Sequence, residues 1–393
     1  MKPIAYLVAP YHPAGGELVN LGAARKIECV VRLLAQLGFR VRLINSGHDR
    51  VGWGSATRLR RSVGGQRLVE LRPFTLPNRP IGKLANAIHA HFLAGALAAH
   101  GRESLVWIYN GYAFECLFAL AFRHPLRLVL ELEDLPSARP RGLRRWQLRV
   151  ERGLLDAVLT RVQLVTCVNR SIATRVGVGA RRSLLLPGVI VDSWRAAAPP
   201  VPFTSAAMRI GYFGGLSVEK GAVCLLELLK VLPEAWCLVV TGSGELAGEF
   251  RSAARADRRM EFHECVADTT LRQLMWSCDV LVNPHQSIQA MDDGVFPFKM
   301  YEYLSTGRLV VTTPLPDSGL ELGNAMVTFD GTAAGLHACL LSAPRLFTQR
   351  AQQIGQLAQQ INREFSEAAV ASRVREALQL ASVATPAMRR RAT

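Results

Sequence analysis

One pattern constrains the fold of this 393-residue chain more than any other: short β-rich runs alternate with segments of helical spacing, and the series occurs twice. Such alternation predicts parallel strands joined by helical crossovers. Between the two series lies the Pro-rich stretch 195–204, which cannot extend a helix. The length also exceeds the roughly 250 to 300 residues at which single cores stop growing, so two domains are expected.

We therefore predict an α/β protein with two tandem Rossmann-like domains that face a common cleft. The predicted domains are an N-terminal Rossmann-like domain over residues 1–195 and a second Rossmann-like domain over 205–345. A helical segment with a basic tail is predicted over 346–393. The predicted strands are Ile4–Ala9, Arg40–Ile44, Leu68–Leu71, Leu105–Tyr109, Leu128–Leu132, Leu164–Val168 and Leu184–Leu186, then Arg209–Phe213, Cys237–Val240, Glu261–His263, Val280–Val282, Leu309–Thr312 and Met326–Phe329.

The composition is that of a globular protein, with 49% apolar and 20% charged residues. The eight cysteines are scattered singly, without the spacing of a zinc site, so we expect buried thiols and no metal. The first apolar run, Ile4–Pro10, is too short for a signal-peptide core, and no apolar patch approaches the roughly 20 residues of a spanning helix. A cytoplasmic location is expected.

Charge is divided unevenly along the chain. Residues 1–195 carry 29 Lys and Arg against 12 Asp and Glu, a net +17, whereas residues 196–393 carry a net −1. Segment 139–152 places six arginines beside Leu143 and Trp146, a pattern typical either of an interfacial helix or of the solvated face of a crossover helix. With Arg58–Arg61 and Arg67 it predicts an anionic membrane surface as a partner; nucleic acid is not expected, because no recognition motif accompanies the charge.

The strongest local signal is segment 209–221, a β-run that ends in Gly214-Gly215 and passes into a helix near Lys220. Glycines let backbone amides approach phosphate oxygens, and Lys220 supplies a full positive charge. The alternative is an ordinary βα turn with a surface lysine.

A second signal is segment 296–307, where Pro297 and Gly307 can begin and end a helix. Lys299 and Glu302 are three residues apart and share a face of that helix. Glu302 lies among apolar neighbours and would pair with hydroxyl groups such as those of a ribose; the alternative is a structural Lys299–Glu302 ion pair.

Segments 212–221, 296–307 and 184–192 together resemble motifs of the retaining family 4 glycosyltransferases of the GT-B fold, in particular bacterial polysaccharide-biosynthesis enzymes. The likeness covers most of residues 200–345 and is looser in the first half. It implies transfer of a sugar from a nucleotide-sugar donor to a lipid-linked or saccharide acceptor, on the inner face of the cytoplasmic membrane. It further implies retention of anomeric configuration without a metal, and no cofactor besides the donor substrate.

By this resemblance Lys220 neutralises the leaving diphosphate, Glu302 binds the ribose hydroxyls, and Gly15-Gly16 lets a loop of the first domain approach the donor. Two positions depart from the family pattern. Gly215 stands where an arginine is usual, and Gly294 where the first of two glutamates is usual. We expect Lys299 to supply the missing positive charge and Asp293 the missing carboxylate.

Two residues of the first half are predicted near the acceptor hydroxyl. Asp134 lies at the carboxyl end of a predicted strand, and His12 lies in the loop after the first strand. The run Glu131-Leu-Glu133-Asp134 has the carboxylate spacing of a metal motif, but Glu131 and Glu133 also alternate on one face of a strand. A lone loop histidine is more often simply polar surface.

Two other functions remain open from the sequence. A nucleotide-sugar epimerase on the same fold would use the same nucleotide groove and would convert the donor alone. A non-catalytic, degenerate transferase acting as a sugar-binding subunit would explain Gly215 and Gly294, since both replace charged family residues.

Overall fold

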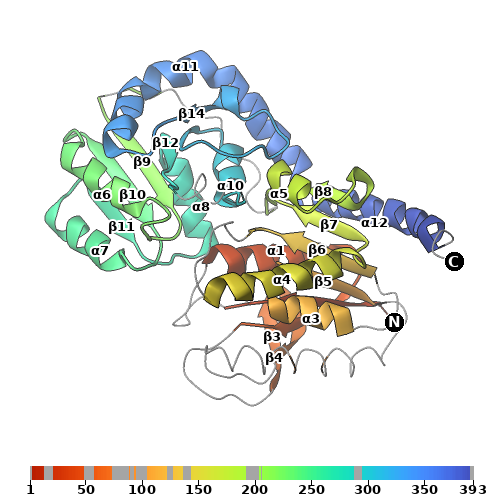
Figure 1. The fold of residues 1–393 in the computed structure, drawn as a ribbon. Coiled ribbons are helices and arrows are strands. Elements are labelled where there is room, and N and C mark those ends of the chain that lie inside the picture. Colours follow the sequence, from red (N-terminus) through yellow and green to blue (C-terminus); the bar gives the residue numbers. More distant parts are fainter. Residues whose placement is uncertain are drawn as a thin grey trace. The chain divides into compact units, whose positions relative to one another are not determined.

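The computed structural model describes residues 2–12, 21–47, 57–72, 88, 93, 104–121, 127–135, 143–191, 203–204, 206–286 and 294–389. The chain forms two compact units, coloured along the sequence in Figure 1. Unit 1 consists of Met1–Leu186 and Glu367–Thr393, and unit 2 of Pro187–Ser366. The sequence predicted a domain boundary between residues 195 and 205 and a C-terminal segment from residue 346. The two units instead divide after Leu186 and after Ser366.

Within its described residues, unit 1 forms an eight-stranded sheet in the order β3-β4-β2-β1-β5-β6-β7-β8. All neighbouring pairs are parallel except β3 and β4. Strands β5 and β7 are buried throughout, as expected for parallel strands covered on both faces. The strands are β1 (Ile4–Ala9), β2 (Arg40–Asn45), β3 (Thr57–Val63), β4 (Gln66–Arg72), β5 (Leu105–Tyr109), β6 (Arg127–Leu132), β7 (Leu164–Cys167) and β8 (Ser183–Leu185).

The hairpin of β3 and β4 was not predicted, because only β4 was expected as a strand. Gly64 and Gly65 connect the two strands with φ values of 54° and 76°. Hairpin turns with positive φ at both central residues favour glycine and match the twist of antiparallel strands. The Gly-Gly pair therefore fixes the register in which Val63 pairs with Gln66.

Helices of unit 1 pack against this sheet and against one another. Apolar side chains of α1 such as Ile27 and Leu34 are fully buried, and α1 also contacts α12. Arg32 of α1 forms an ion pair with Glu367 of α12. The segment from Glu367 onward therefore belongs to unit 1. The helices are α1 (Leu21–Gln36), α3 (Ala113–Ala121), α4 (Leu143–Leu159), α5 (Arg170–Arg175), the 3-10 turn Ala180–Arg182 and α12 (Glu367–Arg389).

Unit 2 forms a six-stranded parallel sheet in the order β11-β10-β9-β12-β13-β14. Each strand predicted in the second half is present. Both sheets are doubly wound, which confirms the predicted α/β class with two Rossmann-like domains. The strands are β9 (Met208–Phe213), β10 (Trp236–Thr241), β11 (Met260–His263), β12 (Val280–Asn283), β13 (Leu309–Thr312) and β14 (Met326–Thr328).

The longest helix of unit 2, α11, curves along the sheet in Figure 1 and carries Pro344 in its interior. A proline there removes one helical hydrogen bond and bends the helix. The helices are α6 (Ala222–Val231), α7 (Ala247–Ala256), α8 (Asp268–Ser277), α10 (Lys299–Ser305), the 3-10 turn Gly323–Ala325 and α11 (Ala333–Glu364). Among the described residues of the chain, no helix is both long and apolar enough to cross a membrane.

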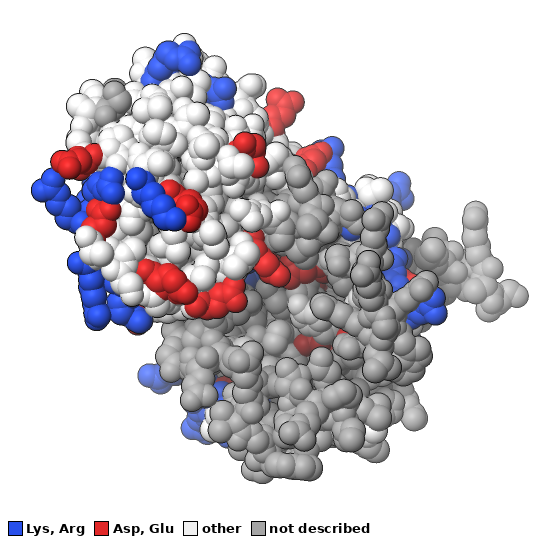
Figure 2. Space-filling model, turned by 60° about the vertical axis from the view of Figure 1, so that its left-hand side comes forward, with Lys and Arg blue, Asp and Glu red and all other residues white. Residues whose placement is uncertain are grey.

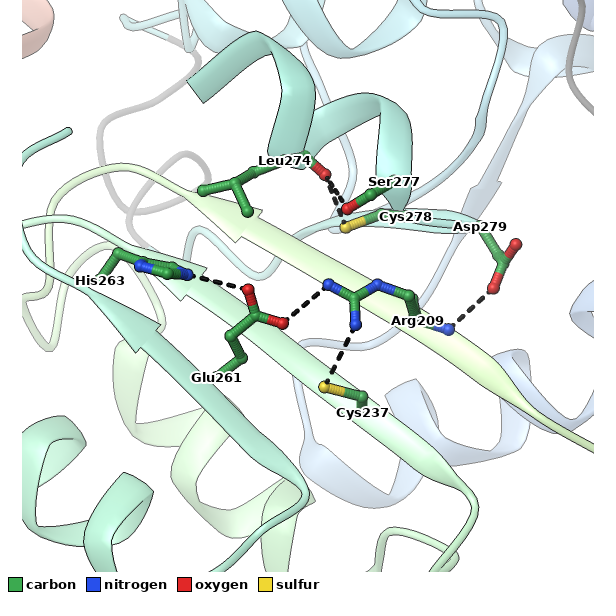
Figure 3. Close-up of polar contacts among 8 residues, drawn as sticks. All are labelled: Arg209, Cys237, Glu261, His263, Leu274, Ser277, Cys278 and Asp279. Carbon is green, nitrogen blue, oxygen red and sulfur yellow. Dashed lines mark hydrogen bonds and ion pairs between the residues drawn. The ribbon is translucent and has the colours of Figure 1, made fainter. Parts of the chain in front are cut away.

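A polar network ties three strands of unit 2 together. Figure 3 shows the Arg209 guanidinium donating to the Glu261 carboxylate at 2.7 Å, while Glu261 also contacts the His263 ring at 2.9 Å. Asp279 accepts a hydrogen bond from the Arg209 backbone amide at 2.8 Å. These residues join β9 to β11 and to the start of β12, so the network holds the sheet together.

The surface of unit 2 mixes both signs of charge. Figure 2 shows Lys and Arg side chains beside Asp and Glu on the face that carries α6 and α7. Exposed ion pairs there include Lys230 with Glu227 and Arg251 with Glu264. Such pairs contribute little to stability, but they agree with the near-neutral charge of the second half.

Candidate active site

The centre of the unit 2 sheet lies between β9 and β12, where the strand order changes direction. Ligands of open α/β sheets bind in the crevice outside the carboxyl ends of the strands at such a point. The two strands end at Phe213 and Asn283, and the segments that follow carry Lys220 and His285. Lys220 is one of the predicted site residues, whereas His285 was not anticipated.

Lys220 and His285 are in direct contact. The Lys220 Nζ lies 2.8 Å from His285 Nε2. His285 is 2% exposed, and its backbone carbonyl accepts a hydrogen bond from the Thr313 hydroxyl at 2.7 Å. Because an ammonium group can only donate, Nε2 is the acceptor and the ring proton resides on Nδ1. The histidine thus fixes the position of the Lys220 ammonium.

Gly221 allows the Lys220 turn to approach the β12 loop. Its φ is 77°, in the left-handed region, and a Cβ at this position would lie 1.9 Å from the Pro284 carbonyl oxygen. The Gln286 amide also donates to the Glu219 carbonyl at 3.1 Å. Only glycine tolerates both the backbone conformation and the contact, so this residue sets the Lys220–His285 distance.

Lys299, the first residue of α10, reaches the same end of β9. Its Nζ lies 4.0 Å from the centre of the Tyr212 ring and 5.8 Å from that of Tyr303, as in cation–π contacts. The Tyr303 hydroxyl donates to the Phe213 carbonyl at 3.0 Å, which anchors α10 to β9. Lys299 is thus positioned by aromatic side chains rather than by the loop.

The glycines after β9 lie next to the two lysines, and their approach to a phosphate group stays a prediction. The Gly214 amide donates to the Thr241 carbonyl and the Leu216 amide to the Ser243 carbonyl, so neither amide points to a free ligand. A Cβ on Gly214 would lie 3.3 Å from Lys299 Nζ, a tight contact, whereas one on Gly215 would lie 3.7 Å from Lys220 Cγ, an ordinary contact distance. Gly214 therefore leaves space for Lys299.

Burial and the charges at this site depress two pKa values. Burial lowers the pKa of Lys299 well below its ordinary range, Lys220 lowers it further, and Glu302 partly opposes the shift. Burial, then Lys220 and Lys299, lower the pKa of His285 to about 2. His285 is therefore neutral at physiological pH, and a bound anion would favour the charged forms of the lysines.

Glu302 lies one turn after Lys299 on α10 and is 4% exposed. Its neighbours Tyr301 and Tyr303 are fully buried. Its negative charge acts on Lys299 and raises the pKa of Tyr303 in addition to burial. The structure places this carboxylate close enough to Lys299 to act on its charge, and its contact with a ribose stays a prediction.

The predicted acceptor residues follow strands of the unit 1 sheet. The His12 ring lies against Gly47, where a Cβ would come within 2.9 Å of Cε1 and Nε2. Asp134 follows β6, and its backbone amide donates to Asn110 Oδ1 at 3.3 Å. Asn110 follows β5, which lies between β1 and β6. His12 and Asp134 therefore follow strands that are two positions apart in the sheet, at the same edge.

Glu131 and Glu133 hold a lysine rather than the metal that their spacing allows. The Lys26 Nζ lies 3.2 Å from Glu131 and 2.9 Å from Glu133, and all three side chains are buried. The Trp107 ring nitrogen donates to Glu131 at 2.8 Å. Among the described residues, no group of three or more His, Cys, Asp or Glu can hold a metal ion.

Three predicted residues, Gly15, Gly16 and Asp293, lie outside the described residues. Sequence reasoning missed His285, although its position two residues after a buried β-run was a usable signal. It also missed Lys26, because a lysine inside a helical stretch gives no sign of burial. Asn110 was missed as well; its φ of 63° is a feature of tertiary structure alone.

Residues 207–360 match the family described as Glycosyl transferases group 1. A search among curated proteins finds no sequence match. Many solved structures share the fold, among them HepE of Anabaena in complex with UDP-glucose, at 16% identity over 96% of this chain and 100% of that chain, with a TM-score of 0.64.

Two further similar structures are synthases. Sucrose-phosphate synthase from Thermosynechococcus elongatus is 14% identical over 98% of this chain and 100% of that chain, with a TM-score of 0.71. An α,α-trehalose-phosphate synthase (UDP-forming) from Burkholderia xenovorans in complex with glucose-6-phosphate is 16% identical over 96% and 100%, with a TM-score of 0.65. Residues 207–360, which contain the lysine site, therefore match a glycosyl transferases group 1 domain, and the chain as a whole has the GT-B fold.

Proposed function

We propose that this chain transfers a sugar from a nucleotide-diphosphate donor to an acceptor hydroxyl, with retention of configuration, without a metal and with no cofactor besides the donor. The observation that carries the proposal is the convergence of Lys220 and Lys299 on neutral His285 between β9 and β12. Cations at the switch point of a parallel sheet favour a bound diphosphate.

In this proposal the bond between the anomeric carbon and the diphosphate oxygen breaks, and a bond from the acceptor oxygen to the anomeric carbon forms on the same face. Negative charge develops on the leaving diphosphate, where Lys220 and Lys299 stabilise it. The acceptor proton passes to the leaving phosphate oxygen, as the family resemblance implies. His285 is neutral and holds Lys220 in place instead of adding charge.

Uridine nucleotides are the first donors to test, since HepE of Anabaena binds UDP-glucose and the trehalose-phosphate synthase is UDP-forming. Glu302 is proposed to bind the ribose hydroxyls, and Asp293 the donor sugar. Gly15 and Gly16 are proposed to admit the donor beside the first domain, and Asp134 and His12 to lie near the acceptor.

We further propose a lipid-linked or saccharide acceptor in polysaccharide biosynthesis, with the enzyme on the cytoplasmic face of a membrane. Support comes from the +17 charge of residues 1–195 and from α4, where Arg149 and Val150 are exposed. Vesicle sedimentation should depend on anionic lipid and fall when Arg141, Arg144, Arg145 and Arg149 become Gln. Arg141 lies outside the described residues. Equal sedimentation with neutral vesicles would remove the membrane from the proposal.

The decisive experiment measures UDP binding by calorimetry and sugar transfer from UDP-glucose. Lys220→Ala should weaken UDP binding at least about tenfold, because a charge-assisted contact is lost, and should lower turnover about a hundredfold. The control is Lys230→Ala, an exposed lysine of the same unit, which should change neither value.

Other outcomes would separate the competing functions. Conversion of the donor alone into an isomer would indicate an epimerase. If the chain binds the donor but neither hydrolyses it nor transfers its sugar to any acceptor tested, it would be a sugar-binding subunit. Full UDP affinity in Lys220→Ala would remove the lysine site from the mechanism.

A further inference from the structure

One face of the outer strands of unit 1 carries a cluster of arginines. Side chains alternate along a strand, so Arg58 and Arg60 of β3 share a face. Arg60 pairs with Val69 of β4, and Arg42 of β2 pairs with Val69 from the other side. Arg67 lies two residues before Val69 on β4, so its side chain is on the same face, opposite Ser62 of β3. Arg40 lies two residues before Arg42 on β2, so it also shares this face.

These side chains line a cavity of about 580 Å³, which has the size of a small-molecule site. Its charged and polar lining consists of Arg40, Arg42, Arg58, Arg60, Arg61, Arg67 and Ser62. Arg61 forms an ion pair with Glu70, and we call the other five arginines the arginine face. Four of them are exposed, whereas Arg42 is half-buried, with its guanidinium carbon 5.9 Å from the centre of the Tyr6 ring.

The acidic residue nearest in sequence to the arginine face, Glu70, is already paired with other arginines. Glu70 is the only acid in 57–72, it is fully buried on the opposite face of β4, and it pairs with Arg61 at 2.5 Å and Arg72 at 2.7 Å. Within the described part of the chain, the arginine face forms no ion pair of its own. Five like charges are thus held within a few strand spacings of about 5 Å, and they repel one another until an anion binds.

We propose that the arginine face binds a ligand with clustered phosphate groups, of the pyrophosphate class. Planar guanidinium groups bind phosphate oxygens in pairs, and Arg42 and Arg60 approach the space above Val69 from two sides. The Ser62 hydroxyl can donate a further hydrogen bond. Single-stranded nucleic acid fits less well, because the described lining residues include no aromatic ring for base stacking.

This site does not depend on the proposed donor site. All its residues belong to unit 1, whereas Lys220 and Lys299 belong to unit 2. The test therefore uses the full chain with Lys220→Ala and Lys299→Met, which removes both lysines of the proposed donor site. Inorganic pyrophosphate is titrated by calorimetry at low salt, where screening is weak.

In this background Arg42→Gln with Arg60→Gln should weaken pyrophosphate binding at least about tenfold, as expected for lost charge-assisted contacts. The matched control, Arg175→Gln with Arg181→Gln, removes two exposed arginines of the same unit and should change affinity less than about twofold. Should Arg42→Gln impair folding, Arg58→Gln with Arg67→Gln provides a second pair with exposed side chains.

A vesicle-binding assay distinguishes a phosphate group carried by a lipid from one carried by a soluble ligand. Sedimentation with phosphatidylcholine vesicles that contain phosphatidic acid, lost in the Arg42/Arg60 variant, would identify a lipid-borne phosphate. Pyrophosphate binding without vesicle binding would identify a soluble ligand. Absence of pyrophosphate binding in the lysine-deficient background, or equal loss in the control pair, would overturn the proposal.

Discussion

The neutral state of His285 makes the stability of unit 2 depend on pH. Its pKa in the folded protein is about 2, against 6.5 for an unperturbed histidine, because of burial and the charges of Lys220 and Lys299. Below pH 6.5 the unfolded chain therefore binds a proton that the folded chain does not. The contribution of His285 to stability is complete above pH 6.5 and is lost as the pH falls, by about 1.4 kcal/mol per unit.

Between pH 7 and pH 5 this loss amounts to about 2 kcal/mol in the free energy of unfolding. His285→Asn removes the titrating group, so the variant should lose about 2 kcal/mol less than the wild type over the same interval. Urea unfolding followed by circular dichroism at both pH values gives the difference. An identical pH dependence in wild type and His285→Asn would refute the assignment of a buried, neutral imidazole.

Three further predictions concern the same structure. Lys26→Met should destabilise the chain by about 3 kcal/mol in urea unfolding, because Glu131 and Glu133 lose their buried partner. Lys230→Met, at an exposed lysine, should change stability by less than about 0.5 kcal/mol, and equal effects of the two variants would contradict the burial of Lys26. Gly221→Ala should lower stability by at least about 1 kcal/mol and weaken UDP binding, because a Cβ would collide with Pro284. Gly179→Ala, where a Cβ meets nothing within 4 Å, should change neither stability nor UDP binding, and an unchanged UDP affinity in Gly221→Ala would show that this turn does not contribute to the site. UDP binding at pH 8 should take up protons, because an anion raises the depressed pKa of Lys299. Calorimetry in buffers of different ionisation enthalpy measures this proton uptake, and uptake that persists in Lys299→Met would come from another group.

The hairpin β3–β4 shows where the sequence carried a signal that the periodicity analysis did not use. Strand β3 has arginines at Arg58, Arg60 and Arg61, so it lacks the apolar run by which the buried strands were found. Its better indicator was Gly64-Gly65, a two-residue turn that pairs flanking strands. The arginine face arises from that pairing, because residues distant in sequence become neighbours only in the register of the sheet.

The sequence by itself determined the alternation of strands and helices, because burial on both faces requires apolar runs such as Leu105–Tyr109 and Val280–Asn283. It also indicated Lys220, Lys299 and Glu302, since their motifs are local. Tertiary structure alone decided which amides the glycine turn leaves available, that Lys26 lies between two glutamates, and that His285 receives the Lys220 ammonium. Each of these depends on contacts between segments that only the packed sheet brings together, and neither spacing nor composition records such distances.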